Sequence, residues 1–436
     1  MIRKVFSRVY PLIILCILLG TSAFTKLKPL YAETVFQEES PTEETKVALP
    51  VEEVKIKGLG KTKPSVLKPY TDPLIGKPFT PLVREQLIQN LRSLGIFHSI
   101  QAYSYPNGNG GSVLQIEVKE KWTLVPIPLG GASSGGSFYG GLLLFESNLL
   151  GYNKKFFGGA ILSESAWKVM TGYIDPRLFQ SDTVLFLGFN GSVDQLQYRT
   201  VSGDLIRRYE KTSFDVISEV AFPLLGKLSL GLGMLFYEQQ VDPSYEGAFN
   251  SPSSGRYLSP TLGLRYQNSY YGPILVYGTF GNVRYEQGWE IGKDTFYGRA
   301  SISLQAFQPV GENHRFGWLL QAQAMPEGPS VLFRKVSGRF LKTLPENLYS
   351  DTILSSQLVA EAVPFTFSWG APTLVLFYET GGFRQEESSS FLWTHGPGAG
   401  FRIYLSKVAV PAFGFDFAYS VYTGQFYGFV NVGLQM

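Results

Sequence analysis

The residues able to do chemistry are few in this chain and lie far apart. The sequence of 436 residues has a single cysteine, Cys16, and three histidines, His98, His314 and His395. The histidines have no metal-ligand spacing, and the chain has no glycine-flanked nucleophile serine or phosphate-binding loop. The acidic pair Glu386-Glu387 lies in a serine-rich segment, where solvated carboxylates are the simpler interpretation. The sequence therefore predicts a protein that is not an enzyme and that uses no metal or cofactor.

The composition limits what the chain binds. Hydrophobic residues make up 44%, aromatic residues 15% and charged residues only 17% of the sequence, which is less charge and more aromatic content than a soluble domain usually has. The formal net charge is +3 and no run of Lys or Arg occurs. We therefore expect no nucleic-acid partner.

The N-terminus has the order of a secretory signal peptide. Basic residues at Arg3, Lys4 and Arg8 precede an apolar stretch over 9–19, and small residues follow. Cleavage after Ala32 is preferred to cleavage after Ala23, which defines residues 1–32 as the signal peptide. A permanent membrane anchor is the alternative, but the apolar stretch is short for a spanning helix. The mature chain would then be an exported protein without cysteine.

Two segments of different texture follow. Residues 33–50 are rich in Glu and Pro and predict a flexible linker. Residues 51–121 predict a small mixed domain of order β-α-α-β-β. Its second helix begins at Thr80-Pro81, a capping residue and a first-turn proline, and ends at Gly95. Its last two strands flank the turn over 106–111.

Residues 122–436 have a period of two. In one representative segment, Leu228, Leu230, Leu232, Met234 and Phe236 alternate with small residues or with Leu235. Apolar residues toward lipid and small or polar residues toward a lumen are typical of transmembrane β-barrels. A soluble β-sandwich of this length would need an unusually large core, and no fixed repeat favours a propeller or β-helix. Counting the segments predicts sixteen antiparallel strands.

The order of several motifs resembles the BamA/TamA-type outer-membrane assembly family, also called bacterial surface antigens. Residues 51–121 resemble its polypeptide-transport-associated (POTRA) domain, through the strand ending at Gly58 and the run Asn90-Leu91-Arg92-Ser93-Leu94-Gly95-Ile96-Phe97. Three barrel segments also match, and they are Glu146-Ser147-Asn148-Leu149-Leu150-Gly151, Tyr173-Ile174-Asp175-Pro176-Arg177-Leu178-Phe179 and Phe377-Tyr378-Glu379-Thr380-Gly381. The resemblance implies one POTRA domain followed by a sixteen-stranded barrel, at residues 122–436.

The resemblance also implies a loop that folds into the lumen between strands eleven and twelve and carries an Arg in a V-R-G-F/Y motif. Here the matching run is Val336-Ser337-Gly338-Arg339-Phe340, in which the Arg has moved to the other side of Gly338. We expect Arg339 to pair with Glu379 and to hold the loop, because a confined charge needs a partner. A solvated surface Arg is the alternative. The secondary candidates are Glu361, Arg334 and Asp351.

A barrel of this kind closes its last strand against its first. The seam would join residues near Trp122, Gly130 and Gly131 to the C-terminal alternation that ends at Leu434 and Met436. Glycines weaken strand pairing because they contribute no side-chain packing, although they equally suit a flexible turn. An open seam would template a client strand by β-augmentation. The POTRA edge at Ser99, Gln101 and Tyr103 would bind a client in the same way.

These features predict an outer-membrane barrel with its POTRA domain in the periplasm, which inserts, assembles or translocates polypeptides. The expected partners are unfolded outer-membrane or secreted polypeptides, membrane lipid and accessory periplasmic or lipoprotein factors. Two alternatives stay open. One is a two-partner secretion transporter for a single substrate, and the other is a surface antigen or passive channel without insertase activity.

Overall fold

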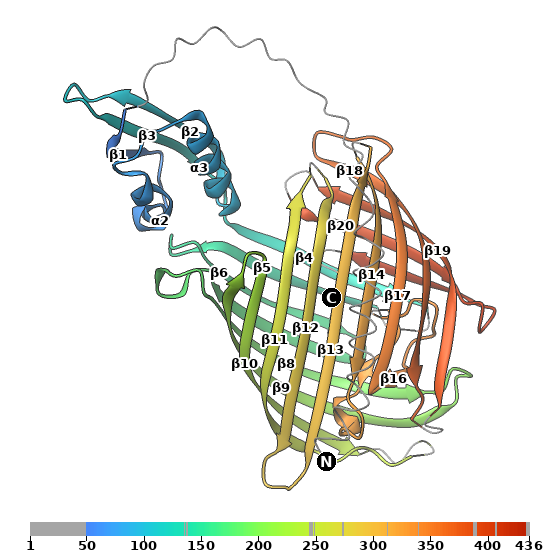
Figure 1. Ribbon diagram of the computed structural model, residues 1–436. Helices are drawn as coiled ribbons and strands as arrows, with labels where there is room; N and C mark the ends of the chain where they lie inside the picture. Colours follow the sequence, from blue (N-terminus) through green and yellow to red (C-terminus); the bar gives the residue numbers. More distant parts are fainter. Residues whose placement is uncertain are drawn as a thin grey trace. The chain divides into compact units, whose positions relative to one another are not determined.

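The computed structural model describes residues 49–436 except 135, 137, 244–246, 248, 273, 312, 339, 387–389, 406–407 and 433–436. The predicted signal peptide and almost all of the predicted linker lie outside the described residues. Within the described ranges, no helix combines the length and the apolar character needed to cross a membrane. Figure 1 shows that strands dominate the structure.

Residues 51–120 form a three-stranded sheet covered by short helices. The strand order is β1-β3-β2, with β1 parallel and β2 antiparallel to the central β3. The elements in chain order are β1 (Val51–Lys57), η1 (Pro64–Val66), α2 (Lys68–Thr71), η2 (Asp72–Leu74), α3 (Pro81–Ser93), β2 (Phe97–Pro106) and β3 (Ser112–Glu120). This order agrees with the predicted β-α-α-β-β pattern.

Helix α3 follows from its sequence signals. The Thr80 hydroxyl accepts a hydrogen bond from the Val83 amide at 3.3 Å, and Pro81 occupies the first turn. Leu87 and Leu91 lie one turn apart and are buried against the sheet. Gly95 then adopts a φ of 75°, which suits glycine and ends the helix.

The rest of the chain is a closed barrel of sixteen antiparallel strands in the described residues. Its strands are β4 (Leu124–Ser133), β5 (Tyr139–Leu149), β6 (Lys154–Ser163), β7 (Ala166–Asp175), β8 (Val184–Arg199), β9 (Leu205–Leu225), β10 (Leu228–Pro243), β11 (Gly255–Tyr271), β12 (Val276–Glu290), β13 (Phe296–Val310), β14 (His314–Ala324), β17 (Thr352–Ala362), β18 (Gly370–Arg384), β19 (Phe391–Leu405), β20 (Val408–Tyr419) and β21 (Phe426–Val432). A short η3 (Leu178–Gln180) links β7 to β8. The predicted strand number is confirmed. Closure leaves no free strand edge among the described strands of the barrel.

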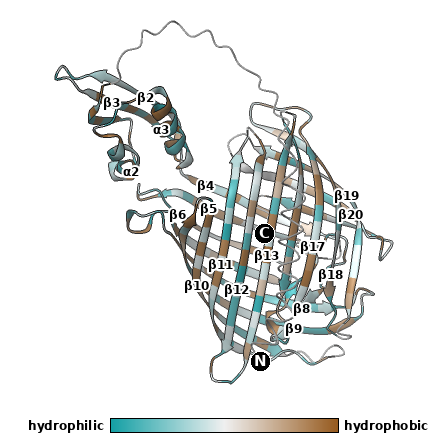
Figure 2. Ribbon diagram, viewed as in Figure 1, coloured by the Kyte–Doolittle hydropathy of each residue, from teal (hydrophilic) through white to brown (hydrophobic). Residues whose placement is uncertain are grey.

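Side chains alternate across the barrel wall as predicted. In β10, Leu232 and Met234 are 47% and 40% exposed on the outer face. Leu235, the next residue along the strand, points to the inner face and is 3% exposed. Figure 2 shows hydrophobic and hydrophilic residues interspersed along the same strands. The outer row suits a hydrocarbon surrounding, and the inner row carries most of the charges discussed below.

One long connection folds inward. Residues 325–351 join the eleventh strand, β14, to the twelfth, β17, and contain η4 (Ser330–Leu332), β15 (Arg334–Lys335) and β16 (Tyr349–Ser350). We call this segment the lumen loop. Its apolar residues Val336, Leu341, Leu344 and Leu348 are fully buried with Phe383 and Leu392 of the wall. A surface loop would expose these side chains, so their burial holds the loop inside the barrel.

Candidate functional site

Glu379 of β18 anchors the lumen loop. Its Oε1 accepts hydrogen bonds from the backbone amides of Lys342 at 2.7 Å and Thr343 at 3.0 Å, and from the Thr343 hydroxyl at 3.0 Å. The Glu379 side chain is 2% exposed. A buried carboxylate needs such donors, and two amides from consecutive residues fix the backbone as well as the side chain.

The predicted partner of Glu379, Arg339, lies outside the described residues, so the Arg339–Glu379 pair stays a prediction. Its neighbours are described. Gly338 has a φ of 77°, and its amide donates to the Leu341 carbonyl at 3.0 Å. Phe340 packs against the buried apolar cluster of the loop. Gly338 and Phe340 therefore shape the turn that delivers Lys342 and Thr343 to Glu379.

Lys342 extends the anchor to the next strands. Its Nζ lies 2.6 Å from Asp416 Oδ2 of β20 and 5.0 Å from the ring centre of Phe377. Asp416 is 1% exposed, so its charge requires a cationic partner. A flexible ammonium held over an aromatic face and against a carboxylate satisfies both groups.

The ion pairs continue along the wall. Arg402 of β19 lies 3.8 Å from Asp416 Oδ2 and also pairs with Glu361 of β17, which lies 2.7 Å from Arg315 of β14. Glu361, a predicted partner for the loop, is thus held by two strand arginines. This chain of ion pairs, in which positive and negative side chains alternate from Lys342 to Arg315, connects the lumen loop to four strands.

The remaining loop candidates lie at different places. Asp351 accepts a hydrogen bond from Arg384 Nε of β18 at 2.9 Å, at the end of the loop. Arg334 lies in β15 beside a polar cavity.

Glu386, interpreted from the sequence as solvated, instead forms an ion pair with Arg207 of β9. That interpretation was wrong because the loop after β18 approaches β9 in three dimensions.

In the described residues, the barrel closes through four residue pairs between β21 and β4. Phe429, Val430, Asn431 and Val432 pair with Ser133, Ala132, Gly131 and Gly130. Trp122 lies before β4 and is 84% exposed, so it takes no part in the pairing. Leu434 and Met436 lie outside the described residues.

Gly131 has a packing reason at this seam. A Cβ at this position would lie 2.5 Å from the Val430 carbonyl oxygen and 2.6 Å from the Tyr139 hydroxyl. The glycine therefore allows β21 to approach β4 closely. One further contact secures the same strands, because the Gly428 amide donates to Ser134 Oγ at 2.8 Å.

The edge of the small sheet is also defined. Strand β2 pairs with β3 only, and the described residues place no strand on its other side. Ser99, Gln101 and Tyr103 are exposed on one face of β2. The Tyr103 hydroxyl donates to Glu117 Oε1 at 2.8 Å, which raises the pKa of Tyr103 and lowers the pKa of Glu117. An unpaired edge of this kind presents main-chain donors and acceptors.

The motif 146–151 forms the turn between β5 and β6. Asn148 is fully buried; its amide donates to Glu146 Oε1 at 2.7 Å, and its Oδ1 accepts from the Asn153 amide at 2.7 Å. Leu150, Gly151 and Asn153 all have positive φ. The Asn148 side chain therefore supplies a hydrogen-bond acceptor for a backbone amide of the turn that has no partner in the strand ladder.

Sequence reasoning missed Lys342, Thr343 and Asp416. Asp416 alternates with Phe415 and Phe417 in the sequence, so its inward direction follows from the period of two. The two loop residues carry no local signal, because the turn at Gly338 decides which of them meets Glu379.

The sequence matches no protein-family model and no curated protein. Solved structures do match. BamA from Haemophilus ducreyi lacking POTRA domains 1–3 aligns with a TM-score of 0.62 and 12% identity, over 90% of this chain and 86% of that chain. CdiB from Acinetobacter baumannii gives a TM-score of 0.60 and 14% identity over 89% and 74%. CdiB from Escherichia coli gives 0.56 and 12% over 94% of both chains.

At such low identities these alignments carry the fold and no residue roles. The three alignments cover between 89% and 94% of this chain. The chain therefore has the fold of the BamA and CdiB outer-membrane barrels.

Proposed function

We propose that this chain is an outer-membrane barrel that inserts or translocates polypeptides, with residues 51–121 acting as a periplasmic POTRA domain. The observation that supports the proposal is the closure of a sixteen-stranded barrel in which the last described strand, β21, pairs with the first, β4. Opening of this pairing would expose unpaired amides and carbonyls on both strands.

An opened seam would act on a client through its backbone. The exposed edge of β4 would pair with a client strand, which supplies main-chain hydrogen bonds with little demand on client sequence. The free edge of β2 would offer a second site of the same chemistry at Ser99, Gln101 and Tyr103. The clients would be unfolded outer-membrane or secreted polypeptides, and the mechanism needs no metal or cofactor.

Translocation through the lumen is the second candidate, favoured by the alignment with CdiB over 94% of both chains. The two candidates make different demands on the barrel. Insertion requires the seam to open, whereas passage through the lumen requires the lumen loop to leave. Crosslinks placed at the two sites therefore separate them.

The experiment uses disulfides in a chain whose only natural cysteine is Cys16. Ala132→Cys with Val430→Cys locks a paired position of the seam. Thr343→Cys with Thr394→Cys locks the loop to β19, where the two hydroxyls lie 3.3 Å apart. Asn282→Cys with Ser303→Cys locks β12 to β13 and serves as the control.

Folding of an unfolded small outer-membrane barrel in liposomes is followed by its heat-dependent gel shift. For an insertase, the oxidised seam variant loses the acceleration and regains it on reduction, while the control variant keeps it. Full activity in the oxidised seam variant contradicts templating at the seam. Loss of export of a secreted client in the loop variant alone favours the translocation mechanism.

A further inference from the structure

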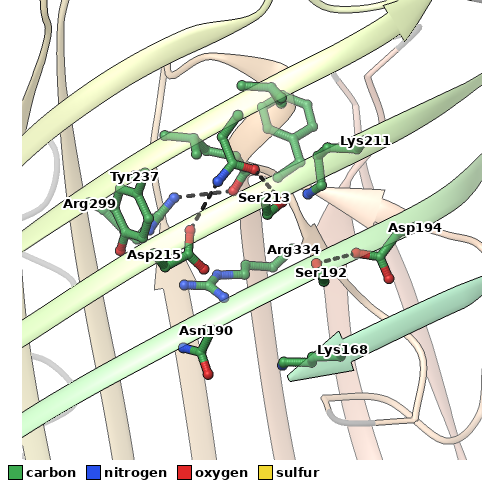
Figure 3. A pocket seen from close by; sticks show the side chains of 14 residues that line it. Lys168, Asn190, Ser192, Asp194, Lys211, Ser213, Asp215, Tyr237, Arg299 and Arg334 are labelled. Atoms are coloured by element: carbon green, nitrogen blue, oxygen red, sulfur yellow. Dashed lines mark hydrogen bonds between the residues drawn. The ribbon is translucent and has the colours of Figure 1, made fainter. Parts of the chain in front are cut away.

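The barrel wall encloses space on both of its faces. On the inner face, Lys168 and Lys211 line the polar cavity beside the lumen loop (Figure 3), and Lys211 lies opposite Asp194 of the neighbouring strand. Charges of both signs therefore line that cavity. On the outer face, residues of β13, β14, β17, β18 and β19 line a second space of about 510 Å³. We call this space the outer groove.

The side chains of the outer groove point away from the lumen. Phe316 of β14 and Leu374 and Leu376 of β18 line it and are exposed, like the other residues of the outer row. Arg315 and Glu361 contribute their backbone only, because their side chains pair with each other on the inner face at 2.7 Å. The groove therefore belongs to the apolar face of the wall.

Two alanines form the floor of the groove. Ala360 and Ala362 are consecutive outward residues of β17. Phe316 and Leu376 are the cross-strand partners of Ala360 on its two sides, and Leu374 is a partner of Ala362. Small side chains between large ones on one face leave a depression, and this depression follows the strand.

The two ends of the depression differ. Leu358, the preceding outward residue of β17, is exposed and larger than alanine, so it ends the depression on one side. On the other side the chain continues into the connection 363–369, which carries Phe365, Phe367 and Trp369, each 48–55% exposed. Their ring centres follow one another at 5.1 and 5.3 Å. Exposed aromatic residues at the rim of an apolar wall are typical of a membrane–water interface.

We propose that the outer groove holds one acyl chain of a membrane phospholipid, with the aromatic connection 363–369 beside the glycerol region of the same molecule. The proposal rests on the proposed membrane location of the barrel, but not on insertion or translocation. The groove is continuous with the outer row of apolar side chains, which faces hydrocarbon in a membrane. An acyl chain is the part of that surrounding with the narrow, extended shape of a depression along a strand.

Shape selects this ligand, because the groove offers little polar chemistry. Among the outward side chains that line it, only His314 is polar, and its Nδ1 accepts a hydrogen bond from the Val363 amide at 3.1 Å. Within hydrocarbon, an acyl chain gains no hydrophobic free energy by entering the groove, so dispersion contacts with the walls decide whether it stays. We therefore expect binding that does not depend on the phospholipid head group.

The test uses the full protein in liposomes of phosphatidylethanolamine and phosphatidylglycerol, in which one of the two lipids carries a diazirine in an acyl chain. After irradiation, mass spectrometry locates the crosslinked peptides. We expect a higher yield on peptides that contain 314–316 and 374–376 than on outward residues of β10 such as Leu232. The yield should be the same for the two head groups.

Ala360→Leu with Ala362→Leu fills the floor of the groove and should lower that yield several-fold. The matched control is Ala322→Leu with Ala324→Leu. These alanines have the same spacing, lie on the same face of β14 as Phe316, and do not line the groove. The heat-dependent gel shift checks folding of each variant. If the filled variant does not fold, Phe316→Ala replaces it, because this substitution removes one wall.

Crosslinks spread evenly over the outer face, or an unchanged yield in the folded groove variant, overturn the proposal and leave the membrane location intact. A yield that depends on the head group also overturns it. A folded barrel without any crosslink on its outer face contradicts the membrane location, and the proposal with it. A second copy of the chain is the alternative occupant, and a dimer in micelles that the filled variant dissociates would identify it.

Discussion

At the scale of single residues, Glu379 is the side chain on which the lumen loop depends most directly. One carboxylate oxygen accepts three hydrogen bonds from Lys342 and Thr343. Two of those donors are backbone amides, which no rotamer change can redirect to another acceptor. Removal of the carboxylate therefore leaves buried N–H groups without a partner.

We predict that Glu379→Ala lowers barrel stability by roughly 2 kcal/mol, the usual cost of unsatisfied buried donors. The measurement is urea unfolding in detergent micelles, followed by the gel shift of the folded barrel. Glu164→Ala, in the exposed turn between β6 and β7, is the matched control and should be neutral. Equal stability of both variants would show that the loop is held by its apolar cluster alone.

Glu120 has a similar role in the small sheet. Its carboxylate accepts from the backbone amides of Gly60, Lys61 and Thr62. Burial acts to raise its pKa, but the hydrogen bonds from Thr62, Lys61 and Gly60 outweigh burial and lower the pKa below the ordinary value of 4.5. The carboxylate form is therefore the one that the fold stabilises.

This shift predicts a pH dependence of the small sheet. A lowered pKa in the folded state contributes stability above pH 4.5, and that contribution is lost as the pH falls through the lower folded value. Amide hydrogen exchange of residues 58–63 should speed up between neutral pH and about pH 3.5, beyond the intrinsic pH effect. Glu120→Gln should remove the dependence. A retained dependence in that variant would assign it to another group.

At the scale of elements, the pairing of β21 with β4 depends on how closely two backbones approach. Gly131 has no room for a Cβ because the Val430 carbonyl and Tyr139 hydroxyl occupy that space. Gly140 on the neighbouring β5 has no atom nearer than 3.9 Å to such a Cβ, apart from its own chain neighbours. A side chain is therefore sterically excluded at Gly131 but not at Gly140.

We predict that Gly131→Ala widens the seam and lowers barrel stability, by about 1–3 kcal/mol, whereas Gly140→Ala is close to neutral. The check is the heat-dependent gel shift together with proteolysis near residue 131 in detergent micelles. If both variants behave alike, close approach at Gly131 does not limit the seam.

At the scale of the whole molecule, the lumen loop and the wall form one connected polar network. Lys342, Asp416, Arg402, Glu361 and Arg315 alternate in sign from the loop to β14. Arg207 with Glu386 adds a tie between β9 and the loop after β18. These contacts keep the loop inside the barrel, where it occupies space that water and ions would otherwise fill.

We predict that deletion of residues 337–347 raises the single-channel conductance in planar bilayers several-fold, because it removes the inward part of the loop. Deletion of residues 250–253, in the connection between β10 and β11, is the control and should leave conductance unchanged. Unaltered conductance in the first variant would mean that other segments close the lumen.

The architecture was predictable because its signals are local. Alternation with a period of two, as at Leu228–Phe236, reports which side of a wall each residue occupies. The capping signals at Thr80-Pro81 and Gly95 likewise define α3 within the segment itself. These patterns need only neighbouring residues, so strand number, strand direction and the small mixed sheet follow from the sequence.

The partners across the lumen were not predictable in this way. Glu379 meets Lys342 and Thr343, and Glu386 meets Arg207, over large separations in sequence that only barrel closure brings together. The same closure surrounds Lys168 and Lys211 with one cavity. A strand specifies the face to which its side chains point, but not the strand or loop that lies opposite. Thus the sequence alone determined the barrel and its two-sided wall, whereas the tertiary structure decided the contacts inside it, because those depend on the path of one inward loop.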